Sequence, residues 1–206
     1  MKILLKLRRK RYTFLTRRKL RRQIRELSKS NKVKLNIGSG ILTYDNWLDL
    51  NLPFFDLTRS DLWAYYFSDA PINNILTEHV LEHLTVEDVK TSLTFAKKYL
   101  HENGVIRIAV PDKNHPNPAY IEYVRPGGSG SGADDHKSFW NFSDFIDLAK
   151  DLGFAYALQE HYDEKGKLIL GELNPERGII TRTAQNKTKS HIADYSSLII
   201  DLWLEE

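Results

Sequence analysis

The stretch Lys34-Leu35-Asn36-Ile37-Gly38-Ser39-Gly40 decides the fold of this chain, because an apolar strand runs there directly into a glycine turn. Glycine has no Cβ, so Gly38 and Gly40 can take positive φ angles and let a ligand lie against the backbone. A helix after such a turn would direct free N–H groups and the positive end of its dipole at that ligand. Only residues 41–46 separate the turn from a second strand over 47–52, so we expect this first helix to be reduced.

The second strand, Trp47-Leu48-Asp49-Leu50-Asn51-Leu52, alternates apolar and polar residues, which places Asp49 and Asn51 on one face. In a doubly wound sheet, a carboxylate or amide at the end of this strand holds the ribose hydroxyls of a nucleoside cofactor. Either residue could serve, and both could equally be surface residues of an edge strand. Asp56, in the polar turn that follows, is a further candidate, for reading a nucleobase edge.

A buried strand over 72–77 leads into Glu78-His79-Val80-Leu81-Glu82-His83-Leu84, which puts two Glu and two His just past the carboxyl end of that strand. Ligands of open α/β sheets bind at this edge. His79 and His83 are spaced i,i+4, so a helical metal-ligand pair is one interpretation. The order is not H-E-x-x-H, however, and no third ligand stands at a recognisable distance. We therefore expect no metal, with His79 facing the pocket and Glu82 and His83 fastening the next helix.

The longest irregular segment is Lys113–Lys137, which is rich in proline and glycine. Loops of this length are usually functional or disordered, and the aromatic stretch over 120–125 favours a substrate lid over residues 112–137. The other patterns predict a helix from Val86 to about His101, a strand over 105–110, a helix over 142–152 capped by Ser143, and strands over 154–161, 167–172, 178–183 and 196–203. Together they predict an α/β fold: a Rossmann-like, mostly parallel sheet with helices on both faces and antiparallel C-terminal strands.

Charge divides the chain into two parts. Residues 1–34 hold fifteen Lys and Arg and one acidic residue, a net +14, so with +3 overall the rest of the chain carries −11. We expect a basic amphipathic arm over 1–32 and a second domain over 33–206. The arm could be a solvated helix packed on the body, could bind an anionic membrane surface through residues 1–28, or, less favoured, could bind nucleic acid.

Several function classes are excluded or disfavoured by composition. There is no cysteine, which excludes disulfides, thiolate metal sites and a cysteine nucleophile. The apolar start of the chain is broken by Lys6 and by the basic run 8–11, so we expect an uncleaved, soluble protein. We place it in the cytoplasm, peripheral to the membrane if the arm binds lipid.

Eight motifs together resemble class I S-adenosylmethionine-dependent methyltransferases over roughly residues 33–203, and more narrowly a group of small predicted methyltransferases associated with surface-glycan synthesis. The motifs are Leu35–Gly40, Trp47–Leu52, Glu78–Leu84, Arg107–Asp112 with His115-Pro116, Arg125–Gly128, Asp135–Lys137, Gly178–Arg182 and Tyr195–Leu198. Two departures stand out: Asn36 occupies the position of the usual acidic residue before the glycine motif, and a third glycine is missing. At the end of the second strand, Asn51 stands where relatives tend to carry Asp.

The resemblance implies S-adenosylmethionine as cofactor. By that likeness the glycine turn would approach the methionine part, the end of the second strand the ribose, Asp56-Leu57 the adenine, and Glu78-His79 the sulfonium side. The implied cofactor-binding residues are Asn36, Gly38, Ser39, Gly40, Asp49, Asn51, Asp56, Leu57, Glu78 and His79.

Methyl transfer to a hydroxyl needs alignment, a water-poor pocket and a base. His136 in the lid is the first candidate base, with Asp112 and His115 as alternatives, because His titrates near neutral pH. Acceptor-binding candidates are Tyr120, Tyr123, Arg125, Asp135, Lys137 and Arg182. We expect an O-methyltransferase acting on a sugar or glycan acceptor; the alternatives are an RNA methyltransferase and a methyltransferase-like binding protein without activity. The sequence leaves the acceptor and the oligomeric state open.

Overall fold

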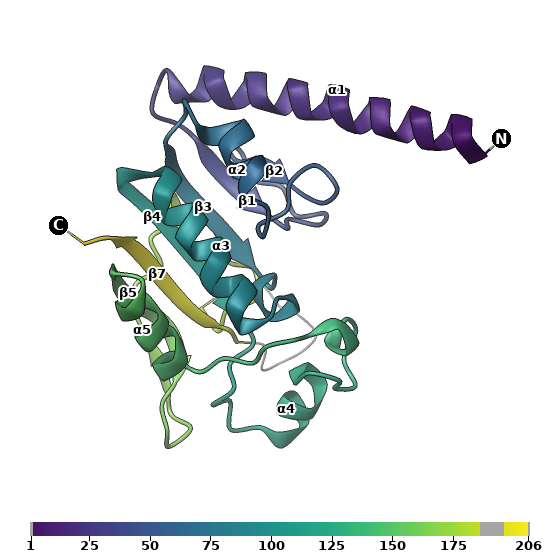
Figure 1. Ribbon diagram of the computed structural model, residues 1–206. Coiled ribbons are helices and arrows are strands. Elements are labelled where there is room, and N and C mark those ends of the chain that lie inside the picture. Colours follow the sequence, from purple (N-terminus) through teal and green to yellow (C-terminus); the bar gives the residue numbers. More distant parts are fainter. Residues whose placement is uncertain (1, 186–195, 206) are drawn as a thin grey trace.

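The computed structural model describes residues 2–185 and 196–205. Its centre is a seven-stranded sheet in the order β2-β1-β3-β4-β7-β5-β6 (Figure 1). The strands are β1 Lys34–Ile37, β2 Leu48–Leu50, β3 Ile72–Glu78, β4 Leu100–Val110, β5 Phe154–Tyr162, β6 Leu168–Leu170 and β7 Leu198–Leu204. Strands β1 to β4 are parallel, whereas β7 runs antiparallel to both β4 and β5, and β6 runs antiparallel to β5. The expected Rossmann-like, mostly parallel sheet with antiparallel C-terminal strands is confirmed.

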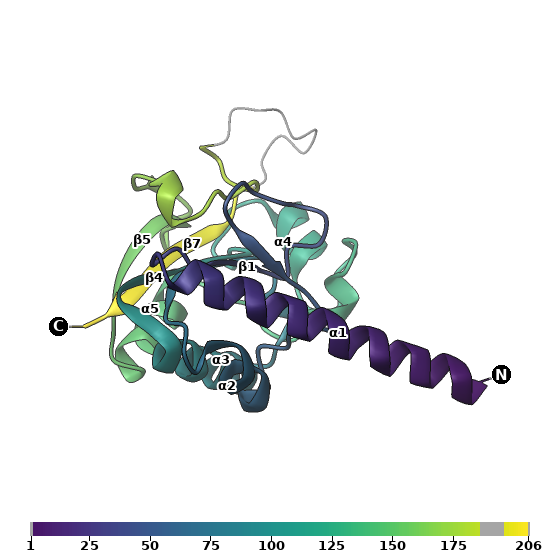
Figure 2. The same ribbon diagram turned by 90° about the horizontal axis from the view of Figure 1, so that it is seen from above.

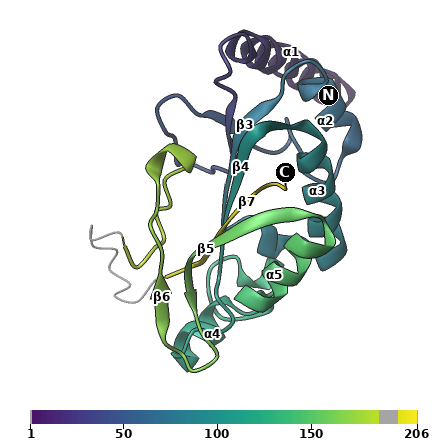
Figure 3. The same cartoon turned by 90° about the vertical axis from the view of Figure 1, so that its left-hand side faces the viewer.

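The two faces of the sheet are covered differently (Figure 3). The α-helices are α1 Lys2–Ser28, α2 Ser60–Phe67, α3 Val86–Tyr99, α4 Pro118–Val124 and α5 Phe142–Asp151. Helices α2, α3 and α5 cover one face, over the large hydrophobic cluster. The other face carries a small cluster of Leu76, Ala109, Ile180 and Ile199, covered by irregular chain and the 3-10 helix η3, Pro175–Arg177. Among the described residues, η3 is therefore the one helix that covers this second face.

Local capping fixes the ends of two helices. Thr85 accepts a hydrogen bond from the Asp88 N–H at 3.1 Å and so caps α3. That helix ends at Tyr99, earlier than the expected His101, because Leu100 already begins β4. Helix α5 is capped by Asn141 through a reciprocal capping box with Asp144, and the expectation of Ser143 as its cap is wrong.

The expectation of a strand over residues 178–183 is also wrong. Residues 178–183 form no strand and pair with no strand of the sheet, although Ile180 is buried. Side chains satisfy its backbone instead: the Glu78 carboxylate accepts the N–H groups of Thr181 and Arg182, and Arg107 donates to the Gly178 carbonyl at 2.6 Å. Because these partners come from distant parts of the sequence, local pattern could not reveal them.

The C-terminal part of helix α1 packs against the body of the protein, whereas its N-terminal part extends away from it. Ile24 near its C-terminal end is fully buried in the large cluster, and Leu20 and Leu27 pack against it. Arg17 donates to the carbonyls of Phe54 at 3.0 Å and Pro53 at 2.8 Å. The N-terminal part projects beyond the sheet (Figure 2). Within the described residues, no helix has the length and apolar character needed to cross a bilayer.

Candidate functional site

A cavity of about 620 Å³ opens at the carboxyl ends of β1, β2 and β3, the edge at which open α/β sheets bind ligands. Its volume lies in the range of small-molecule and cofactor sites, about 300–1,000 Å³. The lining residues are Ile37, Gly38, Gly40, Leu50, Asn51, Leu52, Phe55, Asp56, Leu57, His79, Val80, His83, Leu84 and Asp135.

The glycine turn forms one wall of this cavity. Gly38 and Gly40 have φ angles of 69° and 57°, a conformation that side chains disfavour. A Cβ on Gly38 would lie 2.5 Å from Val80 Cγ2, whereas a Cβ on Gly40 would meet nothing within 4 Å. The first helix, which was expected to be reduced, is absent altogether, since residues 38–47 form turns and irregular chain. The turn therefore offers close backbone approach without a helix dipole.

Asn51 completes the same wall from the end of β2. Its amide nitrogen donates to Ser39 Oγ at 2.9 Å, and its amide oxygen lies 3.4 Å from the Gly40 N–H. Asp49 does not line the cavity, because its carboxylate accepts a 3.0 Å hydrogen bond from Asn36. Asn36 also donates to the Leu42 carbonyl at 3.0 Å, so this buried side chain stabilises the loop that follows the glycine turn. Of the two ribose candidates, Asn51 is the one that reaches the cavity.

The opposite wall is apolar, with one carboxylate. Leu50 and Phe55 are buried side chains of the large cluster, and Leu57 adjoins them. Asp56 accepts hydrogen bonds from the N–H and the hydroxyl of Thr58 at 3.0 and 2.8 Å through one oxygen. A flat apolar group with polar edges would suit this wall.

Glu78 and His79 end β3 but point to different places. The Glu78 carboxylate binds the backbone of Thr181 and Arg182, as described above, and does not line the cavity. His79 lines it and has a φ of 55°, an uncommon conformation outside glycine. Its Nε2 lies 3.0 Å from Ser197 Oγ and its Nδ1 lies 3.0 Å from the Glu82 carboxylate. Two side chains on opposite sides thus fix the imidazole of His79.

The segment over 112–137, which was expected to be a lid, contains two short helices, α4 and η2 (Ala133–Asp135). Asp135 lines the cavity. His136 follows it, with its ring centroid 4.7 Å from that of His83 and its Nδ1 2.7 Å from the Val124 carbonyl oxygen. Among the three candidate bases, His136 alone lies beside a cavity-lining residue in this way.

The other two candidate bases are held inside the structure. Asp112 is fully buried, and its oxygens accept the N–H groups of Asn114 at 2.8 Å and Tyr162 at 2.7 Å. Burial raises the pKa of Asp112 to about 6, although these two hydrogen bonds oppose the rise. His115 is buried and stacks on Tyr120 with ring centroids 3.9 Å apart. Neither lines the cavity.

The acceptor-binding candidates are also dispersed. Tyr120 is buried and donates to the Ser196 carbonyl at 3.1 Å. Arg125 is exposed and paired with Glu122 at 2.8 Å. The exposed candidates Tyr123, Lys137 and Arg182 do not line the cavity either.

Sequence reasoning missed the cavity-facing role of His83 and of the apolar residues Val80, Leu84, Leu52 and Phe55. Three of these lie in the stretch 78–84, which the sequence singled out, but His83 was expected to fasten the next helix and not to face the cavity. The structure has instead a single 3-10 turn, η1 Leu81–His83, which presents His83 to the cavity.

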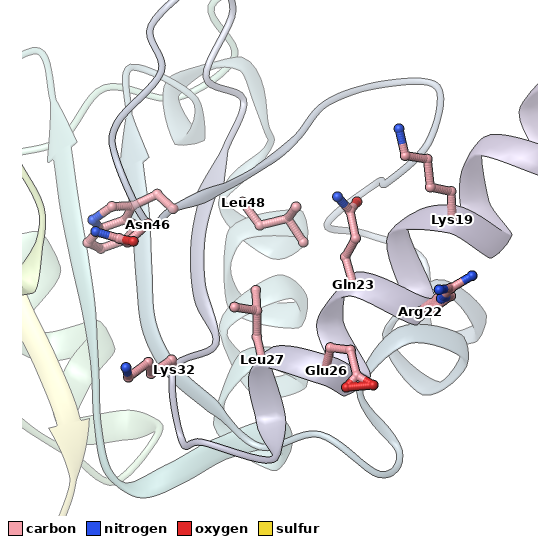
Figure 4. A pocket seen from close by; sticks show the side chains of 9 residues that line it. Lys19, Arg22, Gln23, Glu26, Leu27, Lys32, Asn46 and Leu48 are labelled. Atoms are coloured by element: carbon pink, nitrogen blue, oxygen red, sulfur yellow. The ribbon is translucent and has the colours of Figure 1, made fainter.

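A second cavity of about 630 Å³ lies between α1 and β2 (Figure 4). Leu27 of α1 and Leu48 of β2 lie on its two sides, and the side chains of Lys19, Arg22 and Lys32 give it a basic rim. It lies beside the edge strand rather than at the carboxyl ends of the parallel strands. We therefore take the cavity at the glycine turn as the candidate site.

No family model matches the sequence, and a search of curated proteins returned no match. Solved structures similar to this chain include a SAM dependent methyltransferase from Archaeoglobus fulgidus, with 16% sequence identity, 92% of each chain covered and a TM-score of 0.45. Another is magnesium protoporphyrin IX methyltransferase from Synechocystis PCC 6803 with bound SAH, with 10% identity, 91% of this chain and 83% of that chain covered, and a TM-score of 0.42. At identities this low, the case for a ligand of this chain rests on the side chains of its own cavity.

Proposed function

We propose that this chain is an S-adenosylmethionine-dependent methyltransferase. The observation that carries the proposal is one cavity that combines an open glycine turn, the Asn51 amide and an apolar wall at the carboxyl edge of a parallel sheet. The open space over Gly40 admits a polar chain against the backbone, Asn51 would hold ribose hydroxyls, and Phe55 and Leu57 would pack on a purine. When bound, S-adenosylmethionine supplies an electrophilic methyl group on a sulfonium centre.

The acceptor that we propose is a hydroxyl of a sugar or glycan. In support, three polar groups gather where the lid meets the cavity: Asp135 and His83 line it, and the His136 ring contacts that of His83. With Nδ1–H donating to the Val124 carbonyl, His136 keeps a lone pair on Nε2. His136 is thus the residue that we expect to activate an acceptor hydroxyl.

Titration calorimetry with S-adenosylhomocysteine tests the cofactor assignment. Asn51→Ala should weaken binding about fivefold or more, since a lost hydrogen bond to a ligand hydroxyl is worth roughly 1 kcal/mol. Asn103→Ala, which removes an exposed amide from β4, is the matched control and should bind as the wild type does. Wild-type protein that binds neither S-adenosylmethionine nor S-adenosylhomocysteine would leave the chain a binding protein without methyltransferase activity.

A methyl-transfer assay with labelled cofactor separates the acceptor classes. Hydroxyl-rich oligosaccharides should be labelled, and RNA should not be. Labelling of RNA alone would replace the glycan acceptor by the alternative, an RNA methyltransferase.

We also propose that the arm binds an anionic membrane surface on the cytoplasmic side. The exposed part of α1 combines basic residues with the large apolar side chains Tyr12, Phe14 and Leu15, which are 64%, 56% and 52% exposed. Each basic residue near an anionic bilayer contributes about 1 kcal/mol, and apolar side chains can enter the interface.

Cosedimentation with vesicles tests the role of the arm. Substituting Lys10, Arg11 and Lys19 together by Gln should weaken binding to phosphatidylserine vesicles, and neither form should bind phosphatidylcholine vesicles. Equal binding of wild type and variant to phosphatidylserine vesicles would contradict the membrane proposal and favour a solvated helix. If the arm bound RNA and not the vesicles, nucleic acid would be its partner.

A further inference from the structure

Three potential metal ligands lie together beside the cavity. Two of them, His83 and His136, are 53 positions apart in the sequence (136 − 83). Glu82, His83 and His136 each offer one ligand atom, and these atoms all lie within 4.8 Å of one another. The two imidazole rings are nearly perpendicular, with an interplanar angle of 82°. Small rotations of these side chains would bring the three atoms to the bond lengths of about 2.0–2.2 Å that divalent ions require.

Backbone hydrogen bonds hold this cluster together. The Glu82 carbonyl accepts the N–H groups of Lys137 at 2.7 Å and Ser138 at 3.1 Å, and the Ser138 hydroxyl donates to the Leu81 carbonyl at 3.2 Å. These bonds tie the residues that follow His136 to the 3-10 turn that carries Glu82 and His83. The juxtaposition is therefore built into the fold rather than left to side-chain rotation.

Glu82 is the observation that points to a ligand. Its residue is 1% exposed, and within the described residues its Oε2 has no hydrogen-bond partner. The other oxygen, Oε1, lies 3.0 Å from His79 Nδ1, so one of the two carboxylate oxygens has a polar neighbour among the described residues and the other has none. A buried carboxylate is stable only when it is paired and hydrogen-bonded or coordinates a metal.

One of the two histidines, His136, is oriented as metal ligands usually are. A ligating His commonly donates its second ring N–H to a carbonyl or carboxylate, which fixes the tautomer. In His136 the Nδ1 lies 2.7 Å from the Val124 carbonyl oxygen, which directs the lone pair to Nε2. In His83 the Nδ1 lies 3.5 Å from an oxygen of the exposed Asp135 and has no hydrogen-bond partner among the described residues, so that nitrogen is available to an ion.

We propose that Glu82, His83 and His136 bind a divalent transition-metal ion at the mouth of the cavity. Two imidazoles and one carboxylate suit Zn²⁺, Co²⁺, Mn²⁺ or Fe²⁺ better than Ca²⁺ or Mg²⁺, which prefer oxygen ligands throughout. Three protein ligands leave at least one coordination position for water or another oxygen. Since His83 lines the cavity, a water or acceptor oxygen in the cavity could bind to an ion held by these residues.

The metal site extends the proposed methyltransferase function. Its role in activating the acceptor hydroxyl rests on that proposed function, whereas metal binding itself does not. A hydroxyl bound to the ion would lose its proton more readily than a free one. His136 would then activate the acceptor as a ligand of the ion.

Calorimetric titration of the untagged, chelator-treated full chain with Zn²⁺ and with Co²⁺ tests the site. We expect one ion per chain for the wild type, and a visible d–d absorption band with Co²⁺. Because loss of an outer-shell partner alone weakens metal binding about 10–100-fold, Glu82→Gln and His136→Ala should each weaken it by more than about 100-fold. His101→Ala, a histidine distant in sequence from the cluster whose Nδ1 accepts the Asn103 N–H, is the control and should bind as the wild type does.

The fold of each variant is checked by circular dichroism and by thermal unfolding without metal. Added Zn²⁺ should raise the unfolding temperature of the wild type and of His101→Ala, but not that of Glu82→Gln. No ion bound by the wild type, or equal binding by folded Glu82→Gln, would overturn the site and leave Glu82 as the partner of His79 alone. Binding of S-adenosylhomocysteine is measured separately in chelator, so failure of the metal site and failure of the cofactor site are distinguishable.

Discussion

Gly38 and Gly40 share a backbone conformation but not surroundings, so the same substitution should act differently on the two. Alanine at positive φ costs about 1–2 kcal/mol at either position. At Gly38 the new methyl group would also displace Val80, which adds about 1–3 kcal/mol of overpacking. Gly40→Ala should instead place its methyl group in the open cavity and weaken cofactor binding. Urea unfolding and calorimetry of both variants check this, and equal losses of stability would contradict it.

Asp112 should make the protein less stable as the pH rises, whereas a carboxylate whose pKa is lowered by folding makes a protein more stable as the pH rises. Its pKa is raised from 3.8 to about 6 by burial, so the folded state binds its proton more tightly than the unfolded state. The contribution is fully present below about pH 4 and is lost as the pH rises through about 6, by up to about 3 kcal/mol.

Asp112→Asn is the comparison that isolates this effect, because the variant has no carboxyl group to titrate there. The free energy of unfolding of the wild type minus that of the variant should fall between pH 4 and pH 7. A difference that is constant or rises with pH would show that Asp112 keeps an ordinary or lowered pKa.

At the scale of elements, one buried arginine joins β4, β7 and the segment around η3. Arg107 has no exposed surface; it forms a bidentate ion pair with Asp201 at 2.7 and 2.8 Å and donates to the carbonyls of Asn174 and Gly178. Without Arg107, the buried Asp201 carboxylate keeps only the partly exposed Arg177 as an ion-pair partner at 3.3 Å, and the carbonyls of Asn174 and Gly178 lose their donor. Arg107→Ala should therefore lower the free energy of unfolding by about 3–5 kcal/mol. Arg125→Ala, which breaks an exposed pair, should leave it nearly unchanged.

Hydrogen exchange provides the second measurement for Arg107. In Arg107→Ala the amides of the segment over 171–184 should lose protection more than those of α3, which Arg107 does not contact. Uniform loss of protection over the whole chain would mean that Arg107 acts only through global stability.

At the scale of the whole molecule, we expect the C-terminal part of α1 to unfold together with the body. Ile24 of α1 lies in the same hydrophobic cluster as residues of β1, α2 and α3. Ile24→Ala should therefore lower the free energy of unfolding of the whole chain by about 2–5 kcal/mol. Thermal unfolding followed at 222 nm and by tryptophan fluorescence should give coincident transitions in both proteins, and a separate early helical transition would contradict this.

The sequence predicted the features that depend on local pattern. The apolar runs of β1, β3 and β7 and the cap at Thr85 lie where periodicity and capping rules place them. Pattern failed where a distant partner decides the outcome: the Glu78 carboxylate holds the segment at Thr181 that was expected to be a strand. The sequence placed Gly38 and Gly40 at the cavity and left Asp49 and Asn51 as alternatives there. For the same reason as at Thr181, it could not bring His136 to Glu82.

The shortness of both outer strands has a consequence for how copies of the protein behave when crowded. In the described residues the sheet ends at β2 and β6, each three residues long, and α1 runs close to β2 with the second cavity between them. Long unpaired strand edges are templates for aggregation, whereas short or covered edges are not. Molecules gathered at high local density on a charged surface would thus have little backbone through which to polymerise.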